Sequence, residues 1–361
     1  MKVKKATLVF MTIGLFVCSL IWSPAAEASN GLKFNVKANI PENQHNPEVT
    51  YFDLLMSVGQ TQEISVTLKN NTDEEVIILP KINAAMTNSD GVVEYSNFNN
   101  KERIYDKSLQ TNIEEIVKLE SDEVALAPQE ERELKMTIQM PAEEVTGVIA
   151  GGIYLSQKYT EEKSDKNAVE EGTSTNLRNL FGYQIALLLR NNDNLVTPEV
   201  VYEGAEANQL NARNAVSLKT RNSSPTYINQ AVFKAKITRA GSDETIAEVK
   251  KEKMQFAPNT IFDLYVPMQG KQYEAGDYVL TGSITSGNNE WPIKEAFTVT
   301  REQANKFNEA DPDVEPEDYT MIIVLAALAA VFALAAVYLI RKNKQQKALL
   351  KQLNQNDKNK E

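Results

Sequence analysis

The feature that most constrains this chain is an uncharged stretch near its C-terminus, from Tyr319 to Ile340. A helix of these 22 residues is roughly 33 Å long, which matches the hydrocarbon core of a bilayer. The alternative is a buried core helix, but such helices are seldom this long and apolar on every side. The stretch therefore predicts a single transmembrane helix over residues 319–340.

The charges on either side of this stretch predict how it is oriented. A basic segment beginning with Arg341 and Lys342 follows it directly, and an acidic segment from Asp311 to Asp318 precedes it. Basic residues are retained on the cytoplasmic side of a membrane. We therefore expect a single-pass protein of the cell membrane, with residues 341–361 as a basic cytoplasmic tail and the N-terminal part outside.

The first 28 residues have the organisation of a secretory signal peptide. Three lysines precede an apolar segment from Ala6 to Trp22, and Ala26-Glu27-Ala28 forms a small-residue cleavage site. The only cysteine, Cys18, lies inside the apolar segment. The exported part of the chain therefore has no disulfide, and its domains must be stabilised by hydrophobic cores.

Composition argues against several classes of function. The net charge is −11 although both ends of the chain are basic, so the exported region is strongly acidic; it should repel nucleic acid and anionic polymers, and favour basic or neutral partners. His45 is the only histidine, which excludes histidine-dependent triads and multi-histidine metal sites within one chain. We find no nucleotide-binding or metal-binding motif, and expect neither a cofactor nor an enzyme. A wall hydrolase that uses two carboxylates is the weakest alternative.

From Leu32 onward, apolar residues recur at every second position, as in half-buried antiparallel strands. Turn sequences such as Ser89-Asp90-Gly91 and Ala127-Pro128 separate these runs. About seven short strands over roughly 125 residues predict an immunoglobulin-like β-sandwich, which we assign to residues 29–158. Residues 101–120 are less regular, and fit either a short helix or a long connection.

The charged run from Ser156 to Asn176 offers no apolar face and predicts a linker or loop. The strands that flank it, residues 148–155 and 183–190, could pair with each other as one long hairpin. The second domain is therefore assigned to residues 159–302, with the alternative that the boundary lies near residue 191.

A second set of alternating strands predicts a second sandwich of about 110 residues. The expected strands are 200–202, 215–219, 232–237, 261–266, 278–284 and 291–299. Residues 303–318 are expected to form an acidic stalk, with a brief helix and then an extended segment. The predicted fold class is thus all-β, with two immunoglobulin-like sandwiches followed by one transmembrane helix.

The candidate binding residues lie near the start of the first domain. Glu42, Asn43 and Gln44 offer hydrogen-bond donors and acceptors suited to a glycan, and Tyr51 offers an aromatic platform. An alternative for the polar residues is a turn in which they satisfy local backbone groups. The alternative for Tyr51 is a place in the core.

Several stretches of the sequence resemble the WxL-interacting surface proteins of Gram-positive bacteria, and together they cover most of the chain. In the first half these are Pro41 to Gln44, Tyr51 to Leu54, Gly59-Gln60, Ala85, Thr87, Gly91, Tyr95, Met140-Pro141 and Gly147 to Gly152. In the second half they are Met254, Ala257-Pro258-Asn259, Gly276 and Tyr278. The order of signal peptide, two β domains, membrane span and basic tail is also that of the family. Thr260 departs from it, because serine is expected there.

The resemblance implies a first domain of the peptidoglycan-binding type and a second domain of the host-binding type. It further implies a non-enzymatic cell-surface scaffold that assembles with WxL-domain proteins and, in a suitable habitat, contacts host or extracellular-matrix proteins. The alternative is an accessory subunit that senses the envelope or assists assembly, and signals through the transmembrane helix.

Overall fold

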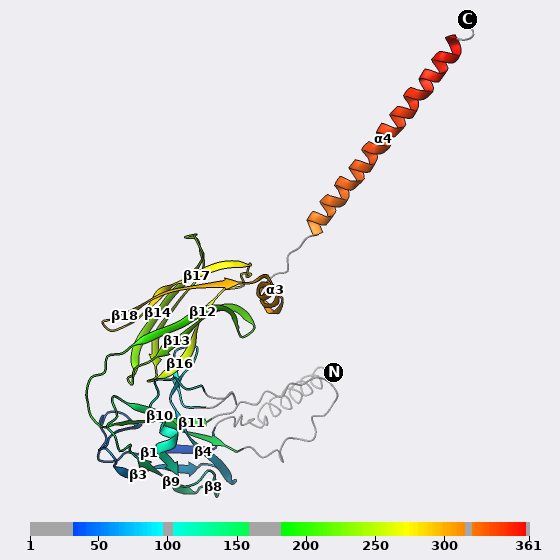
Figure 1. Cartoon of the computed structure of the whole chain (residues 1–361). Coiled ribbons are helices and arrows are strands. Elements are labelled where there is room, and N and C mark those ends of the chain that lie inside the picture. Colours follow the sequence, from blue (N-terminus) through cyan, green and yellow to red (C-terminus); the bar gives the residue numbers. More distant parts are fainter. Residues whose placement is uncertain (1–31, 97–103, 159–181, 315–319, 359–361) are drawn as a thin grey trace, which may run out of the picture.

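The computed structural model describes residues 32–96, 104–158, 182–314 and 320–358. The predicted signal peptide lies outside these residues, as does most of the charged linker. Two β-sandwiches come first, followed by a short helix packed against the second sandwich and one long helix that stands apart (Figure 1). The predicted fold class is confirmed.

The first sandwich consists of a four-stranded sheet, β1-β3-β9-β7, facing a five-stranded sheet, β2-β11-β10-β4-β8. The strands of the first sheet are β1 (Phe34–Asn39), β3 (Thr61–Asn70), β9 (Glu131–Gln139) and β7 (Val117–Leu119). Those of the second sheet are β2 (Phe52–Leu55), β11 (Gly182–Arg190), β10 (Ile149–Gln157), β4 (Val76–Ala84) and β8 (Val124–Leu126). Alternate residues of both sheets, among them Phe34, Leu68 and Ile78, are fully buried between them. The irregular region predicted around residues 101–120 contains the short helix α2 (Ile113–Ile116), which Asn112 caps.

The predicted hairpin across the charged run is formed by β10 and β11. These strands pair antiparallel, with Ile153 opposite Ile185 and Ile149 opposite Leu189. Strand β11 also buries Leu187 and Leu189 in the first core. The first sandwich thus extends to Arg190, past the limit at residue 158 and close to the alternative boundary near 191.

The second sandwich pairs a three-stranded sheet, β12-β13-β16, with a four-stranded sheet, β15-β14-β17-β18. The strands are β12 (Val200–Leu210), β13 (Arg213–Asn222), β14 (Ile228–Arg239), β15 (Thr245–Phe256), β16 (Thr260–Pro267), β17 (Gly276–Ser286) and β18 (Asn289–Val299). Phe233, Leu264 and Leu280 lie at the centre of its core. The periodicity did not predict β15, because lysine and glutamate fill five of its twelve positions and it lies at the edge of its sheet.

The segment expected to be a stalk is largely packed against the second sandwich. Helix α3 (Arg301–Ala310) begins with a capping box at Thr300 and Gln303, and buries Ala304. After it, the side chain of Asp311 accepts a hydrogen bond from the backbone N–H of Asn214, at 2.7 Å. The brief helix was thus expected, but its docking was not. The chain stays attached to the second sandwich at least as far as Asp313, which forms an ion pair with Arg213.

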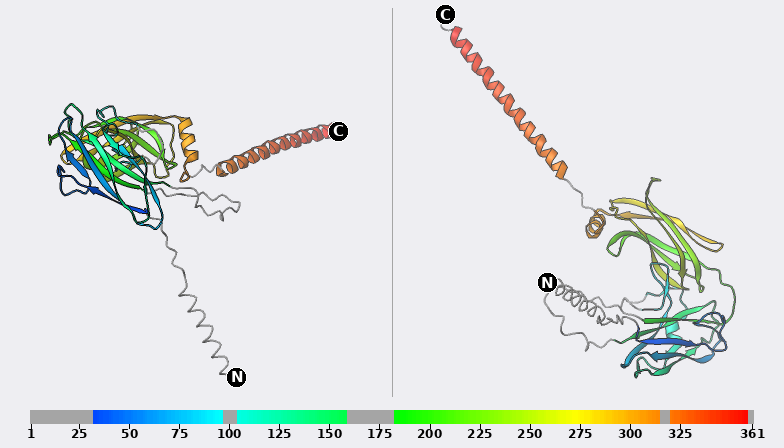
Figure 2. Two further views of the ribbon diagram at one scale, coloured as in Figure 1. Left: turned by 90° about the horizontal axis from the view of Figure 1, so that it is seen from below. Right: turned by 180° about the vertical axis from the view of Figure 1, so that it is seen from behind.

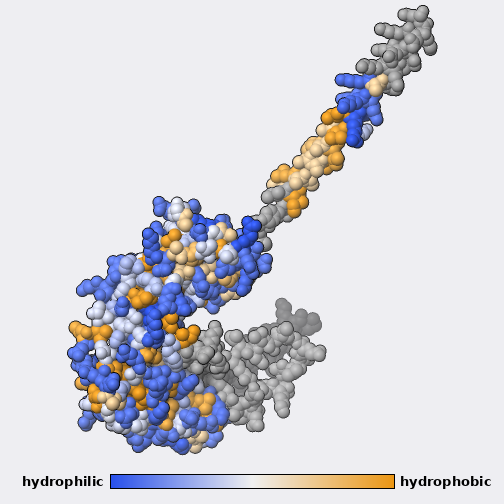
Figure 3. Space-filling model, viewed as in Figure 1, coloured by the Kyte–Doolittle hydropathy of each residue, from blue (hydrophilic) through white to orange (hydrophobic). Residues whose placement is uncertain are grey.

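The long helix α4 (Thr320–Lys358) makes no contact with the sandwiches in any view (Figures 1 and 2). It contains one segment long and apolar enough to cross a membrane, Ile323–Ala348. Its apolar side chains form a band, which the basic residues follow (Figure 3). The helix continues without a break past Ile340, where the span was expected to end, and through the basic segment.

Candidate functional site

The two sandwiches meet at a junction that a hairpin of the first sandwich helps to build. Strands β5 (Met86–Thr87) and β6 (Val93–Glu94) form this hairpin. The hydroxyl of Thr87 accepts a hydrogen bond from the backbone N–H of Ala257, at 2.9 Å, and lies 3.1 Å from the hydroxyl of Thr260. At the turn, the carbonyl of Gly91 accepts from the N–H of Gln255, at 2.8 Å. The hairpin is thus bonded to β15 and to the loop that follows it.

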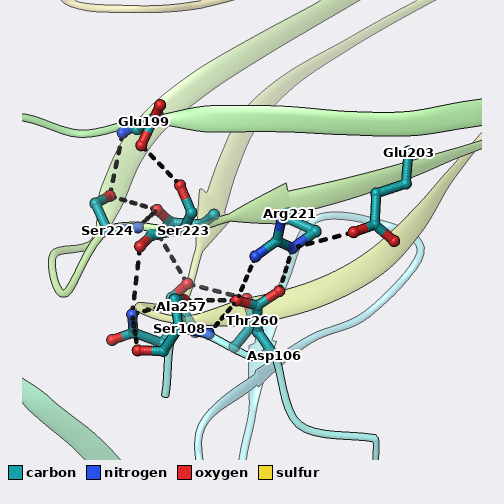
Figure 4. Close-up of polar contacts among 11 residues, drawn as sticks. Asp106, Ser108, Glu199, Glu203, Arg221, Ser223, Ser224, Ala257 and Thr260 are labelled. Atoms are coloured by element: carbon teal, nitrogen blue, oxygen red, sulfur yellow. Dashed lines mark hydrogen bonds and ion pairs between the residues drawn. The ribbon is translucent and has the colours of Figure 1, made fainter. Parts of the chain in front are cut away.

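A buried ion pair crosses the same junction. Asp106 of the first sandwich receives two hydrogen bonds from the guanidinium of Arg221 on β13, and the one from Nη2 to Oδ1 measures 2.9 Å (Figure 4). Both side chains are almost fully buried, at 1% and 6% exposure. Glu203 lies on the other side of the guanidinium, with 3.5 Å between its Oε1 and Arg221 Nε. The bidentate geometry fixes both position and angle between the two sandwiches.

The surroundings of Asp106 keep it ionised. Burial by itself raises its pKa, but hydrogen bonds from Arg221 and from both the hydroxyl and the N–H of Ser108 lower it more. The net result is a pKa of about 2, below the ordinary 3.8. The same hydrogen bond raises the pKa of Arg221. The pair therefore stays charged on both sides at any physiological pH.

Two asparagines connect this ion pair to the loop after β15. Asn259 donates from Nδ2 to the carbonyl and to the hydroxyl of Ser108, at 3.1 and 2.9 Å. Asn222 donates to the carbonyl of Ala257, at 2.8 Å. The hydroxyls of Ser223 and Ser224 extend the polar contacts to Glu199 (Figure 4). The run Ala257-Pro258-Asn259, one of the stretches that carry the family resemblance, is thus held from both sandwiches.

Three tyrosines form the apolar side of the junction. Tyr51, Tyr95 and Tyr227 pack with Ala150 and Leu188 on the outer face of the five-stranded sheet. The hydroxyls of Tyr95 and Tyr227 lie 3.4 Å apart. Burial raises the pKa of all three tyrosines, so their hydroxyls remain neutral donors. Tyr51 is the least buried of the three and its ring is partly open to solvent.

A cavity of about 350 Å³ also lies at the junction. Its walls come from both sandwiches and include Ala85, Val145, Pro225, Pro258 and Asn259. Gly147 lies between the lining residues Thr146 and Val148 and adopts φ 71°, and an added Cβ there would lie 2.1 Å from the carbonyl oxygen of Pro225. The two sandwiches therefore approach too closely at this point for any side chain at residue 147.

The predicted binding residues lie together beside this junction, but most of their polar groups are engaged. Asn43 exchanges two amide hydrogen bonds with Gln62, at 2.9 and 2.8 Å. Gln44 donates to the carbonyl of Tyr51, at 2.8 Å, and accepts from the N–H of Asp53, at 3.1 Å. These amides satisfy local backbone groups, as the turn alternative expected. Glu42 is exposed to solvent.

Sequence reasoning missed Asp106, Arg221 and Tyr227. The two partners of the ion pair are 115 residues apart, so no local spacing relates them. The sequence neighbours of Arg221, which are Lys219, Thr220 and Asn222, are polar and gave no signal of burial, although the structure buries every position from Thr220 to Asn222. Once the structure shows a charged residue buried there, a buried partner is expected.

The arrangement is suited to holding surfaces in place. The carboxylate of Asp106 accepts hydrogen bonds from Arg221 and Ser108, and the guanidinium gives two of its donors to that carboxylate. Within the residues that the structure describes, no group of three or more histidine, cysteine, aspartate or glutamate side chains could hold a metal ion.

Comparisons with known proteins divide the chain in a similar way. Residues 34–157 match the family model described as WxL Interacting Protein, peptidoglycan binding domain, and residues 172–309 match the one described as WxL Interacting Protein, host binding domain. No curated protein matches the sequence significantly.

Solved structures show only a distant likeness. A Salmonella enterica SafA pilin in complex with the SafB chaperone is 11% identical, with 75% of this chain and 99% of that chain covered and a TM-score of 0.29. The YadV chaperone is 9% identical, with 74% and 100% covered and a TM-score of 0.28. A PapD-like domain of human CEP192 is 10% identical, with 48% and 97% covered and a TM-score of 0.27. These scores carry no argument about function, and the architecture rests on the strand pairing described above.

Proposed function

Because the chain belongs to the WxL-interacting protein family, we propose that it is a non-enzymatic, membrane-anchored scaffold that binds peptidoglycan and WxL-domain proteins. The observation that carries this proposal is that the two matched domains, one of the peptidoglycan-binding and one of the host-binding type, form two sandwiches ahead of one apolar helix. Under this proposal the first sandwich contacts the wall, and the second is available to host or extracellular-matrix proteins.

The proposed location is the cell membrane, with both sandwiches outside and the basic end of α4 in the cytoplasm. The charge asymmetry around the candidate span supports this orientation, since Arg341, Lys342 and Lys344 follow it directly. We also place the boundary between the two domains between Arg190 and Val200. The first hydrophobic core ends at Leu189 and the second begins at Val200.

The binding role is tested with the full-length protein in detergent micelles. We expect it to sediment with insoluble peptidoglycan and to capture a purified WxL-domain protein of the same organism. If the protein neither sediments with peptidoglycan nor captures the WxL-domain protein, the scaffold proposal is contradicted. Release of soluble muropeptides from the same peptidoglycan would instead indicate a hydrolase.

Within the first sandwich we propose Tyr51 and Glu42 as glycan contacts, with Asn43 and Gln44 supporting the backbone beneath them. Tyr51 has a partly exposed ring, which can stack on a sugar, and the hydrogen bond from Gln44 to its carbonyl holds it in place. Tyr51→Ala should weaken sedimentation with peptidoglycan about fivefold. The matched control is Tyr265→Ala, a partly exposed tyrosine of the second sandwich, which should leave sedimentation unchanged.

A second candidate function, signalling through the membrane helix, is favoured by one observation. Helix α4 runs unbroken from the candidate span into the basic segment, to Lys358, so a rotation outside would be carried inside by one rigid element. Exchanging residues 320–358 for an unrelated anchor separates the two functions. Surface assembly that survives the exchange favours the scaffold, and assembly that requires the native helix favours signalling.

A further inference from the structure

The outer face of the four-stranded sheet in the second sandwich carries a cluster of lysines. Lys234 and Lys236 are exposed on β14, where they alternate with buried residues. Lys250 lies opposite Lys234 on the neighbouring strand β15. On the other side, Thr281 lies opposite Lys236, and Lys294 lies opposite Thr281 on β18. Lys234, Lys236 and Lys250 are therefore neighbours about 5–7 Å apart on one sheet face, and Lys294 lies on the same face two strands from Lys236, about 10 Å away.

These lysines are under-neutralised in a protein that is acidic overall. Many exposed bases elsewhere lie beside a carboxylate, as in the pairs Lys135–Glu63 and Lys158–Glu123. In the part of the chain that the structure describes, Lys234, Lys236 and Lys294 form no ion pair. Two glutamates partly offset the positive charge of the cluster. Glu252 pairs with Lys250, at 2.5 Å, and Glu248 lies opposite Lys236 without an ion pair.

The position of Lys234 opposite Lys250 costs stability in the free protein. Like charges directly opposite in an antiparallel pair repel each other. Charged residues on an edge strand prevent unwanted strand pairing, which accounts for lysine on β15 but not on the central strand β14. The repulsion is relieved by any ligand that brings negative charge to this face.

Hydroxyl groups lie between the lysines. Thr281 separates Lys236 from Lys294, and Ser283 lies opposite Lys234. The hydroxyl of Thr281 is buried and has no hydrogen-bond partner among the described residues. A depression of about 590 Å³ is lined by Lys234, Lys236, Lys250, Gln269 and Thr281, and also by Glu248. It therefore brings three ammonium groups and one amide together with one carboxylate, while the buried Thr281 hydroxyl is closed to solvent.

We infer that this lysine face binds a linear sulfated polysaccharide. The regular rows of a sheet suit a polymer whose charges recur at fixed intervals, and the hydroxyl of Ser283, opposite Lys234, can bond a sulfate oxygen. A polypeptide partner would need an apolar or aromatic centre to its contact. The centre of this face carries lysine, threonine and serine, and its apolar residues Val232 and Val279 lie toward opposite ends of the strands. The inference rests on the proposed host-binding role of this domain, since sulfated polysaccharides lie outside the bacterial wall, on the host side.

The test measures binding of the full-length protein, in detergent micelles, to immobilised heparin at a series of salt concentrations. The wild type should bind with an affinity that falls steeply with salt. The triple variant Lys234→Gln, Lys236→Gln and Lys294→Gln should bind about tenfold more weakly at 0.15 M salt, and with a shallower salt dependence. The matched control replaces Lys37, Lys81 and Lys118, exposed lysines of the first sandwich, by glutamine and should bind like the wild type.

Three results would overturn the inference. One is the absence of heparin binding by the wild type, and another is an equal loss in the control triple variant. The third is tighter binding to a soluble polyglycerol phosphate than to heparin, which would assign the face to a phosphate polymer. Sedimentation with peptidoglycan is measured on the same variants. It should be unaffected, so a failure of this inference is distinguishable from a failure of the proposed wall-binding function.

Discussion

Arg221 and Asp106 hold opposite charges in a place where either charge alone would be costly. Burying an ion pair gives little net stability, because desolvation offsets the attraction, whereas removing one partner leaves an unpaired charge in a dry site. The pair joins strand β13 of the second sandwich to a connection of the first. Its effect is therefore to select one relative placement of the two sandwiches over others.

Replacing Arg221 by methionine should lower the free energy of unfolding by about 3–5 kcal/mol, because Asp106 then loses its partner. Adding Asp106→Leu in the same chain should restore much of the loss, since no unpaired charge remains. Urea unfolding followed by tryptophan fluorescence measures both effects. Lys135→Met is the control. It breaks the exposed pair with Glu63, which solvent screens, and should leave the unfolding free energy nearly unchanged. Equal losses for Arg221→Met and Lys135→Met would contradict the role of the buried pair.

The lowered pKa of Asp106 predicts a pH dependence of stability. Because its pKa falls from 3.8 to about 2 on folding, the contribution is complete above about pH 4 and is lost as pH falls toward 2. This lowering of the pKa corresponds to about 2 kcal/mol of folding free energy. Other carboxylates titrate in the same range, so the measurement is the difference in urea midpoint between wild type and Asp106→Asn. That difference should shrink from pH 5 to pH 2, and a constant difference would rule out the ionised carboxylate as its cause.

At the scale of elements, the hairpin of β5 and β6 depends on one glycine. Gly91 adopts φ 71°, and a Cβ placed on it would lie 2.3 Å from Cε and 2.8 Å from Cβ of Met254. The carbonyl of Gly91 accepts a hydrogen bond from the N–H of Gln255. The hairpin can come close enough to β15 for this bond only because residue 91 has no side chain.

Gly91→Ala should therefore cost about 2–4 kcal/mol, from backbone strain and from the clash with Met254. Gly241→Ala is a matched control, because φ is 79° there and no atom lies within 4 Å of the added Cβ. It should cost only the backbone strain, about 1 kcal/mol. Thermal unfolding of the two variants compares these costs. A control as unstable as Gly91→Ala would mean that the hairpin does not dock as described.

The elements differ in how well sequence alone predicted them. Strands such as β3 and β9 were predicted because one of their faces is buried and the other is solvated, which imposes a period of two. Strand β15 was missed because it lies at an edge, where its exposed lysines and glutamates hide the period. The docking of α3 was missed because its contacts, from Asp311 to Asn214 and from Phe307 to Gln209, are long-range.

The distinction between local and long-range contacts also applies to the residues of the candidate site. The turn alternative described Asn43 and Gln44, because both side chains bond nearby backbone carbonyls, of Leu55 and Tyr51, while their binding role stays a prediction. Asp106, Arg221 and Tyr227 become neighbours only when the two sandwiches meet. A pattern within one strand cannot specify how the two sandwiches meet. The family resemblance did include residues of the junction, namely Gly91, Tyr95, Met254 and Ala257.

At the scale of the whole molecule, the junction makes one body of the two sandwiches. An apolar cluster, a hairpin and a buried ion pair all cross it, so a change of angle between the domains would break all three together. Helix α4 stands outside this body (Figures 1 and 2).

The proposed topology predicts which sites a membrane-impermeant reagent can reach. The only natural cysteine, Cys18, lies in the predicted signal peptide, so single cysteines can be introduced without a background. Asn288→Cys, in the exposed turn before β18, should react with a charged maleimide on intact cells. Asn343→Cys, just beyond the apolar band, should react only after the cells are opened. The reverse pattern would invert the topology.

The docking of α3 has a consequence for how far this protein can reach. The chain is held to the second sandwich as far as Asp313, and α4 begins at Thr320. The six peptide units from Val314 to Thr320 can extend by at most about 22 Å. Under the proposed topology this short connection keeps the second sandwich near the bilayer surface. Any ligand of the second sandwich, whether a wall polymer or a host molecule, must therefore reach inward to the membrane-proximal part of the envelope.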